Sequence, residues 1–149
     1  QGSNPVEARF ERFAAEVVFD PADLSGARVV VTVDVASLRT GDPKIDAQIL
    51  ASAGLDAARF PEARYETLAF RAKGGDLYEV HARLSLHGLT REVTHDARIT
   101  VTGSEARAVG EVPLLRTDYG IGQGPFASGS IVSVEVTVRF DLAARRAGG

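Results

Sequence analysis

Two residue types that often carry chemistry or record a chain's history are missing from this sequence: it contains no cysteine and no methionine. Without cysteine the chain can form no disulfide, no thiolate nucleophile and no thiolate metal site. Cysteine-free proteins occur in oxidising and reducing compartments alike, so this absence does not locate the protein. Because translation begins with methionine, we expect residues to have been lost from the start, either with a signal peptide or by truncation.

The sequence also lacks an excess of positive charge and long apolar runs. Lysine and arginine number 17 against 20 aspartate and glutamate, for a net charge of -3. This balance argues against a nucleic acid as partner, because binding to phosphates needs clustered positive charge. No apolar run approaches the roughly 20 residues that a membrane-spanning helix needs. The 149 residues, 44% hydrophobic and 25% charged, predict one globular domain over residues 1–149.

Alternation of apolar and polar residues with a period of two dominates the sequence and predicts strands with one buried face. The segment 132–142 is the clearest, because valine, phenylalanine or leucine occupies every even-numbered position. The same pattern recurs at 29–35, 78–86, 93–101 and 106–114. The sequence therefore predicts an all-β, antiparallel fold.

Two segments interrupt the alternation. The apolar positions are even-numbered up to Phe10 and odd-numbered from Phe13, which predicts an extra residue near Glu11–Arg12 and a bend in the strand. Between Tyr65 and Phe70 the odd and even positions compete for the inner face, so the pattern leaves the register there open.

One helical insert is predicted among the strands. Asp42 is a favourable N-cap and Pro43 suits the first helical position. Ile45 and Ile49 lie one turn apart and would pack on the sheet. Gly54 suits the C-terminal cap.

Five stretches, in order along the chain, resemble the YceI-like, polyisoprenoid-binding family. They are Phe10–Pro21, Val31–Asp42, Phe60–Tyr65, Leu84–Thr94 and Leu115–Gly122. Each stretch is a weak signal by itself, whereas their order and their spread over nearly the whole chain make the set more specific.

The resemblance implies a lipocalin-like barrel of about eight antiparallel strands. Its interior would hold an amphiphilic isoprenoid lipid or a quinone, and the protein would act in the periplasm or outside the cell. The family pattern includes a strand before Val6 that this sequence does not show. We therefore expect the first strand to be cut off, or to be supplied by another chain.

A barrel of this size can fill with its own side chains or can hold one ligand. Small residues at predicted inner positions favour a cavity: Ala8, Ala15, Ala82, Ala97, Ala106, Ala108 and Gly110. Aromatic residues near strand ends would surround its mouth. The candidate ligand-binding residues are Phe10, Phe13, Leu50, Phe60, Tyr65, Leu84, His95, Tyr119, Ile121 and Phe126.

His95 interrupts an otherwise apolar inner face. It could bond a quinone carbonyl or another ligand head group, or it could be a core histidine paired with a neighbour. His81 and His87 have the outward parity and lie too far apart to chelate one metal, so no metal site is predicted. Arg39 and Arg116 could meet an anionic head group, although most surface arginines are simply solvated.

The sequence thus favours a binding or carrier protein for an apolar ligand, without a required cofactor. The alternative is a protein-interaction or dimerisation module with a filled barrel. An enzyme would need a nucleophile and a base in contact, and no Gly-x-Ser-x-Gly motif is present.

Overall fold

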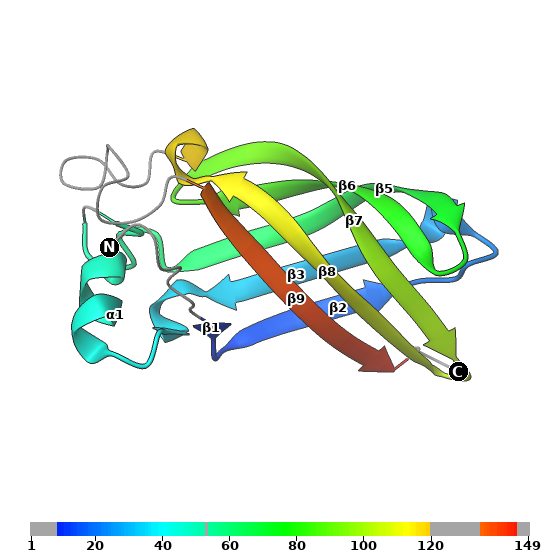
Figure 1. The fold of residues 1–149 in the computed structure, drawn as a ribbon, viewed down its shortest axis with the longest axis horizontal. Helices are drawn as coiled ribbons and strands as arrows, with labels where there is room; N and C mark the ends of the chain where they lie inside the picture. The colour runs from blue at the N-terminus through cyan, green and yellow to red at the C-terminus, as the bar shows by residue number, and fades with distance from the viewer. Residues whose placement is uncertain (1–8, 53, 120–134, 146–149) are drawn as a thin grey trace.

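A computed structural model of the protein describes residues 9–52, 54–119 and 135–145, and seven of its strands form one curled antiparallel sheet (Figure 1). The sheet order is β2-β3-β5-β6-β7-β8-β9. The strands are β2 (Phe13–Val18), β3 (Arg28–Asp34), β5 (Glu62–Gly74), β6 (Leu77–Leu86), β7 (Leu89–Thr102), β8 (Glu105–Leu115) and β9 (Glu135–Arg145). This architecture confirms the all-β prediction.

The shorter elements lie beside this sheet. Strand β1 (Arg9–Phe10) pairs with β4 (Leu38–Arg39), and helix α1 (Pro43–Leu50) follows β4. Three single turns of 3-10 helix complete the described chain: η1 (Leu24–Gly26), η2 (Val35–Ser37) and η3 (Arg116–Tyr119).

The curled sheet has two different ends (Figure 1). At the end that we call the hairpin end, β5 turns into β6 and β7 turns into β8. At the opposite end, the α1 end, lie α1, β1 and the β6–β7 turn. Among the described residues, β2 and β9 are the two edges of the sheet and no ladder joins them. The described strands of this sheet therefore make a half-barrel of seven strands, and the strand expected before Val6 would lie outside the described residues.

The packed core lies toward the hairpin end. Its central members are Phe19, Tyr78, Val80, Ala82, Ala97, Ile99 and Ala108. The rings of Phe70 and Tyr78 meet the ring of Phe19 edge-on, with centroids 5.4 and 5.2 Å away. Burying large aromatic side chains supplies much of the stabilisation of such a core.

A register shift in β5 settles which side chains of that strand face inward. Tyr65 pairs with Leu84 and Thr67 pairs with Ala82, but the ladder then shifts between Thr67 and Ala69. Beyond the shift, Phe70 takes the inward position opposite Val80. The competing parities of the sequence are therefore both correct, on either side of one bulge.

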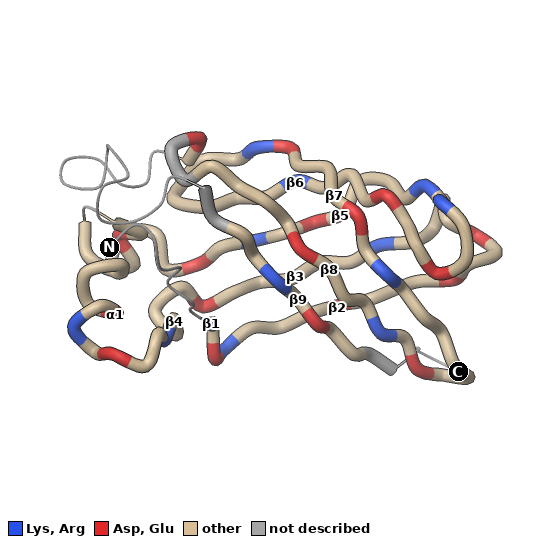
Figure 2. The backbone as a smooth tube through the Cα atoms, viewed as in Figure 1, with Lys and Arg blue, Asp and Glu red and all other residues tan. Residues whose placement is uncertain are grey.

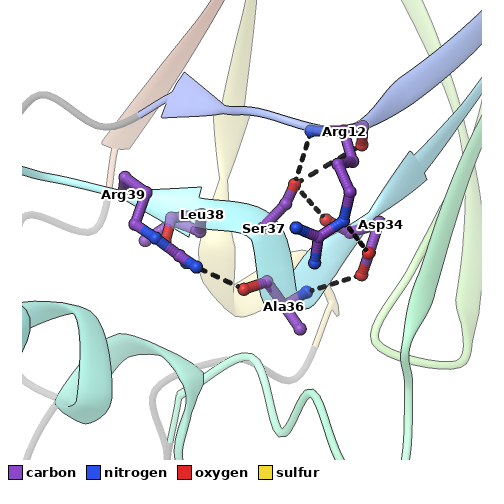
Figure 3. A network of polar contacts seen from close by, with 6 residues as sticks. All are labelled: Arg12, Asp34, Ala36, Ser37, Leu38 and Arg39. Atoms are coloured by element: carbon purple, nitrogen blue, oxygen red, sulfur yellow. Dashed lines mark hydrogen bonds and ion pairs between the residues drawn. The ribbon is translucent and has the colours of Figure 1, made fainter.

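The predicted interruption near Glu11–Arg12 is a corner held by a polar network (Figure 3). The Arg12 backbone N–H donates to Ser37 Oγ at 2.9 Å, and that hydroxyl donates to the Asp34 carbonyl at 2.7 Å. The Arg12 guanidinium donates to the Asp34 carboxylate at 2.8 Å. The corner separates β1 from β2, so the opening segment pairs first with β4 and then with β3.

Helix α1 begins as predicted and ends earlier than predicted. Asp42 accepts a hydrogen bond from the Lys44 backbone N–H at 2.9 Å, and Pro43 is the first helical residue. The prediction of Gly54 as the C-terminal cap was wrong, because the helix ends at Leu50 and Ala51 is the cap. Gly54 instead packs beside the helix end, where a Cβ atom would lie only 2.2 Å from the Ile49 carbonyl oxygen.

Charged residues of both signs are spread along the strands of the sheet (Figure 2). Many of them pair across strands, as Arg107 does with Asp141 and Arg139 with Glu111. The Arg107 guanidinium lowers the pKa of the Asp141 carboxyl group below its ordinary value. Exposed pairs of this kind add little to stability, because water screens the charges. These charged pairs are thus exposed to solvent.

Candidate functional site

The concave face of the half-barrel is unevenly filled. At the hairpin end, inward side chains such as Val80 and Ile99 are buried. At the α1 end, Phe13 lies opposite Val33 on the inward side, yet it is 53% exposed. Val138 on β9 faces inward opposite Val112 and is 39% exposed. The inward apolar side chains of the two edge strands therefore remain open to solvent at this end.

A hydrogen-bonded pair lies between these two halves. Tyr65 on β5 and His95 on β7 face each other across β6, and the Tyr65 hydroxyl lies 2.6 Å from His95 Nε2. The other ring nitrogen, Nδ1, lies 3.0 Å from the Asp96 carbonyl oxygen. His95 is buried, whereas Tyr65 is half-buried. Of the two interpretations of His95, the structure places it in the paired arrangement.

Small residues make room for these rings. Ala82 lies on β6 between the two strands that carry the pair, and it is fully buried. On β8, a Cβ atom at Gly110 would lie 2.7 Å from the Phe140 ring and 2.9 Å from the Asp96 carbonyl oxygen. The ring of Phe140 in turn meets the ring of His95 edge-on, at 5.6 Å between centroids.

The small inward residues therefore have a different role from the predicted one. At the hairpin end they accommodate aromatic rings, so they do not mark a ligand cavity there. The hollow that remains between Val17, Val29 and Leu142 has a volume of about 10 Å³. This is about the room that a single water molecule needs.

The Tyr65–His95 pair holds its proton on the tyrosine. Burial raises the pKa of Tyr65. Burial also lowers the pKa of His95, and the Asp96 carbonyl and carboxylate oppose this lowering with a smaller effect. Both shifts disfavour transfer of the proton from the hydroxyl to the ring. Nor does a carboxylate orient the histidine, because Nδ1 bonds a backbone carbonyl. The contact therefore lacks the features of an activated nucleophile.

A second cluster holds the α1 end together. His87 adopts a left-handed backbone conformation, with φ of 56°, in the turn after β6. Its Nδ1 atom donates to the Tyr119 carbonyl oxygen at 2.9 Å, and its ring packs against Phe60 at 4.7 Å. His87 is thus partly buried within the turn, and does not continue the outward face of the strand as its parity predicted. Burial raises the pKa of the Tyr119 hydroxyl.

The other candidate residues gather at the same end. Phe10 in β1 and Leu50 at the end of α1 are half-buried, and Phe60 lies under the Arg59 guanidinium at 4.9 Å. Leu84 is the ladder neighbour of Tyr65. Two further candidates, Ile121 and Phe126, lie outside the described residues.

The two arginines proposed for a head group lie in β4 and in η3. The Arg39 guanidinium donates to the carbonyl oxygens of Ala36 and Leu38, so it is engaged by its own turn. Arg116 is the first residue of η3.

Sequence reasoning missed Arg91 and Phe140 as site residues. Arg91 lies opposite Leu84, which places it on the inward side of β7 near the rim. The parity of Val93 extends to Arg91 and could have identified it. The contact between Phe140 and His95 depends on the pairing of β8 with β9. The alternation within one strand does not show which strands pair.

Comparison with known proteins gives this fold a family. The model of the YceI-like domain matches residues 1–144. The chain belongs to the YceI-like family. A UPF0312 protein of Vibrio cholerae is 29% identical over 126 residues, which cover 80% of this chain and 67% of that protein.

Solved structures extend the YceI-like assignment to three dimensions. BcnA of Burkholderia cenocepacia is 32% identical, with a TM-score of 0.91, over 95% of this chain and 89% of that one. A polyisoprenoid-binding domain from Saccharophagus degradans has a TM-score of 0.71 at 18% identity, over 93% and 84% of the two chains. At that identity the second likeness concerns the fold alone.

The sequence signature of the YceI-like family is largely structural in this chain. Asp34 caps η2 by accepting from the Ala36 N–H, and the fully buried Ser37 holds the Arg12 corner. Thr40 donates from both its backbone N–H and its hydroxyl to Asp46, which ties β4 to α1 and lowers the pKa of that carboxyl. These contacts set the shape of the α1 end.

Other kinds of site find little support in the described part of the chain. No group of three or more histidine, aspartate or glutamate side chains is placed there to hold a metal ion. None of the helices in the same residues has the length and apolar character to cross a membrane.

Proposed function

We propose that this protein is a binding or carrier protein that holds an isoprenoid lipid or quinone in the α1 end of its half-barrel. One observation carries the proposal: inward apolar side chains are packed at one end of the concave face and solvent-exposed at the other. Exposed apolar surface on a concave face is a common property of ligand sites. A ligand whose hydrocarbon chain covers Phe13 and Val138 would gain about 0.8 kcal/mol of binding free energy for each buried methylene.

The family supports the same class of ligand. The Saccharophagus degradans domain with this fold is described as polyisoprenoid-binding. A few isoprene units would supply enough apolar area to offset the entropy lost on association. Recognition would rest mainly on apolar contact, with the Tyr65–His95 pair as a polar feature between the packed and the open halves. We further propose that the protein acts in the periplasm or outside the cell, where it would transport or sequester its ligand.

The ligand can be identified directly. The protein would be purified from its native host without detergent, extracted into organic solvent and analysed by mass spectrometry. We expect an isoprenoid or quinone in near-equal molar amount to protein. Protein stripped of lipid should take up added polyprenols or quinones, measured by quenching of its tyrosine fluorescence. An empty extract together with no uptake would rule the proposal out.

That negative outcome would favour the open edge as the functional surface. Strand β2 reads FAAEVV, with one charged residue in six, and lacks a ladder partner on its outer side among the described residues. An apolar edge with few charges favours pairing with another strand. Light scattering over a range of protein concentrations would then show whether two copies associate, and replacing Ala14 by lysine should weaken that association.

A further inference from the structure

The hydrogen atoms of the Tyr65–His95 pair can be assigned from its neighbours. A carbonyl oxygen can only accept, so His95 Nδ1, at 3.0 Å from the Asp96 carbonyl, carries a hydrogen and donates it. Burial keeps the imidazole neutral by lowering its pKa. A neutral ring carries one hydrogen, so Nε2 is bare and accepts the Tyr65 hydroxyl hydrogen across 2.6 Å.

This assignment decides what the pair can offer to a ligand. The only hydrogen of the Tyr65 hydroxyl is committed to His95, whereas its oxygen retains lone pairs that can accept. Both nitrogens of His95 are already bonded. Tyr65 is half-buried and His95 is buried, so the tyrosine is the more exposed member of the pair. The pair therefore presents an acceptor and no donor.

The nearest other inward hydroxyl lies deeper. Thr67 is one inward position further along β5 and is 7% exposed. Its Oγ1 atom accepts from the Val29 backbone N–H at 2.8 Å, which ties it to the wall of the packed end. Of these two inward hydroxyl residues of β5, Tyr65 is therefore the one nearer the α1 end.

We propose that the Tyr65–His95 pair selects ligands whose inner end donates a hydrogen bond, such as a polyprenol or a quinol, over ligands that can only accept, such as an ether, an aldehyde or a quinone. An acceptor placed against Tyr65 would meet the lone pairs of the hydroxyl oxygen and would lose its bond to water. This inference rests on the proposed function, because it concerns the polar end of a ligand held in the same interior.

A pair of ligands with the same chain provides the test. Geranylgeraniol and its methyl ether differ in whether the terminal oxygen carries a hydrogen. Their dissociation constants would be measured with lipid-free protein by isothermal titration calorimetry. We expect the alcohol to bind roughly 3- to 10-fold more tightly, the range that one net hydrogen bond provides.

Replacing the histidine should remove this preference. In His95→Leu the Tyr65 hydroxyl hydrogen is released and can be donated to the ether oxygen, so the ratio of the two dissociation constants should fall below about 2. His81→Leu is the matched control, because His81 lies on the outward side of β6 and bonds Glu92. It should keep the wild-type ratio. Circular dichroism would confirm that both variants are folded.

The outcomes separate this inference from the function on which it rests. If neither ligand binds the wild-type protein, the proposed function fails. If both bind the wild-type protein equally well, the function stands and the selection by Tyr65 and His95 is wrong. A preference that persists unchanged in His95→Leu would also overturn the inference, because another group would then be its cause.

Discussion

The two ends of the half-barrel are built from the same strands and the same alternating pattern, yet one is filled and the other is open. Phe19 and Phe13 show the contrast most directly. Both follow the odd parity of the opening strand, but Phe19 is 7% exposed and Phe13 is 53% exposed. The difference lies in the partners, because Phe70 and Tyr78 close around Phe19. Alternation thus determines which face a side chain is on, whereas the opposing rings determine whether that face is filled.

The largest expected effect comes from removing the same side chain at each end. Phe19→Ala should lower the free energy of unfolding by about 3–5 kcal/mol, because it leaves a cavity among packed rings. Phe13→Ala should lower it by less than about 1 kcal/mol, because that ring is already half in water. Urea denaturation followed by circular dichroism would measure both.

Equal losses in the two variants would contradict this comparison. They would mean that Phe13 is covered in solution, and that the α1 end is closed in the absence of ligand.

Gly110→Ala tests the boundary between the two ends. The added methyl group would meet the Phe140 ring at 2.7 Å and the Asp96 carbonyl oxygen at 2.9 Å. The carbonyl belongs to the backbone and cannot move aside as a flexible side chain can. We expect a loss of about 1–3 kcal/mol in the same denaturation experiment, as is typical of overpacking.

A glycine whose close neighbour is a flexible side chain provides the control for this prediction. Gly26→Ala would approach only the Asp23 side chain, at 3.2 Å, and should cost clearly less than Gly110→Ala. A smaller loss for Gly110→Ala than for Gly26→Ala would show that Phe140 does not pack tightly against this site.

The sequence predicted the fold more completely than the site. Alternation, the Asp42 cap and the break before Phe13 each depend on neighbouring residues, so a single sequence contains them. The Tyr65–His95 bond depends on three strands in register and on the bulge after Thr67, which the pattern left open. The small residues suggested a cavity because their small side-chain volumes can be read from the sequence. The rings that fill the space beside them come from strands that are distant in the sequence.

The pH dependence of stability gives a smaller effect centred on the same boundary. Burial lowers the pKa of His95 below its ordinary value of 6.5, so the unfolded chain binds this proton more readily than the folded protein. The contribution of the neutral histidine is complete above that value and is lost as the pH falls from it through the lower pKa of the folded protein. His95→Leu should therefore lose less stability than the wild-type protein between about pH 7.5 and about pH 5.5.

Thermal unfolding at several pH values would measure these slopes. Parallel slopes for wild type and His95→Leu would mean that His95 can be protonated without disturbing its bond to Tyr65.

The variant with the smallest expected loss of stability should show a clear loss of ligand affinity, and its substitution lies at the open end alone. Phe13→Ala removes an inward ring that a ligand would cover, so the affinity for geranylgeraniol should fall by roughly 3- to 10-fold. Val18→Ala is the matched control on the same strand, because Val18 is 59% exposed but faces outward opposite Arg28. Its affinity should be unchanged. Equal affinities in both variants would place the ligand away from β2, whereas a loss in Phe13→Ala alone would show that the exposed half of the concave face is the part that binds.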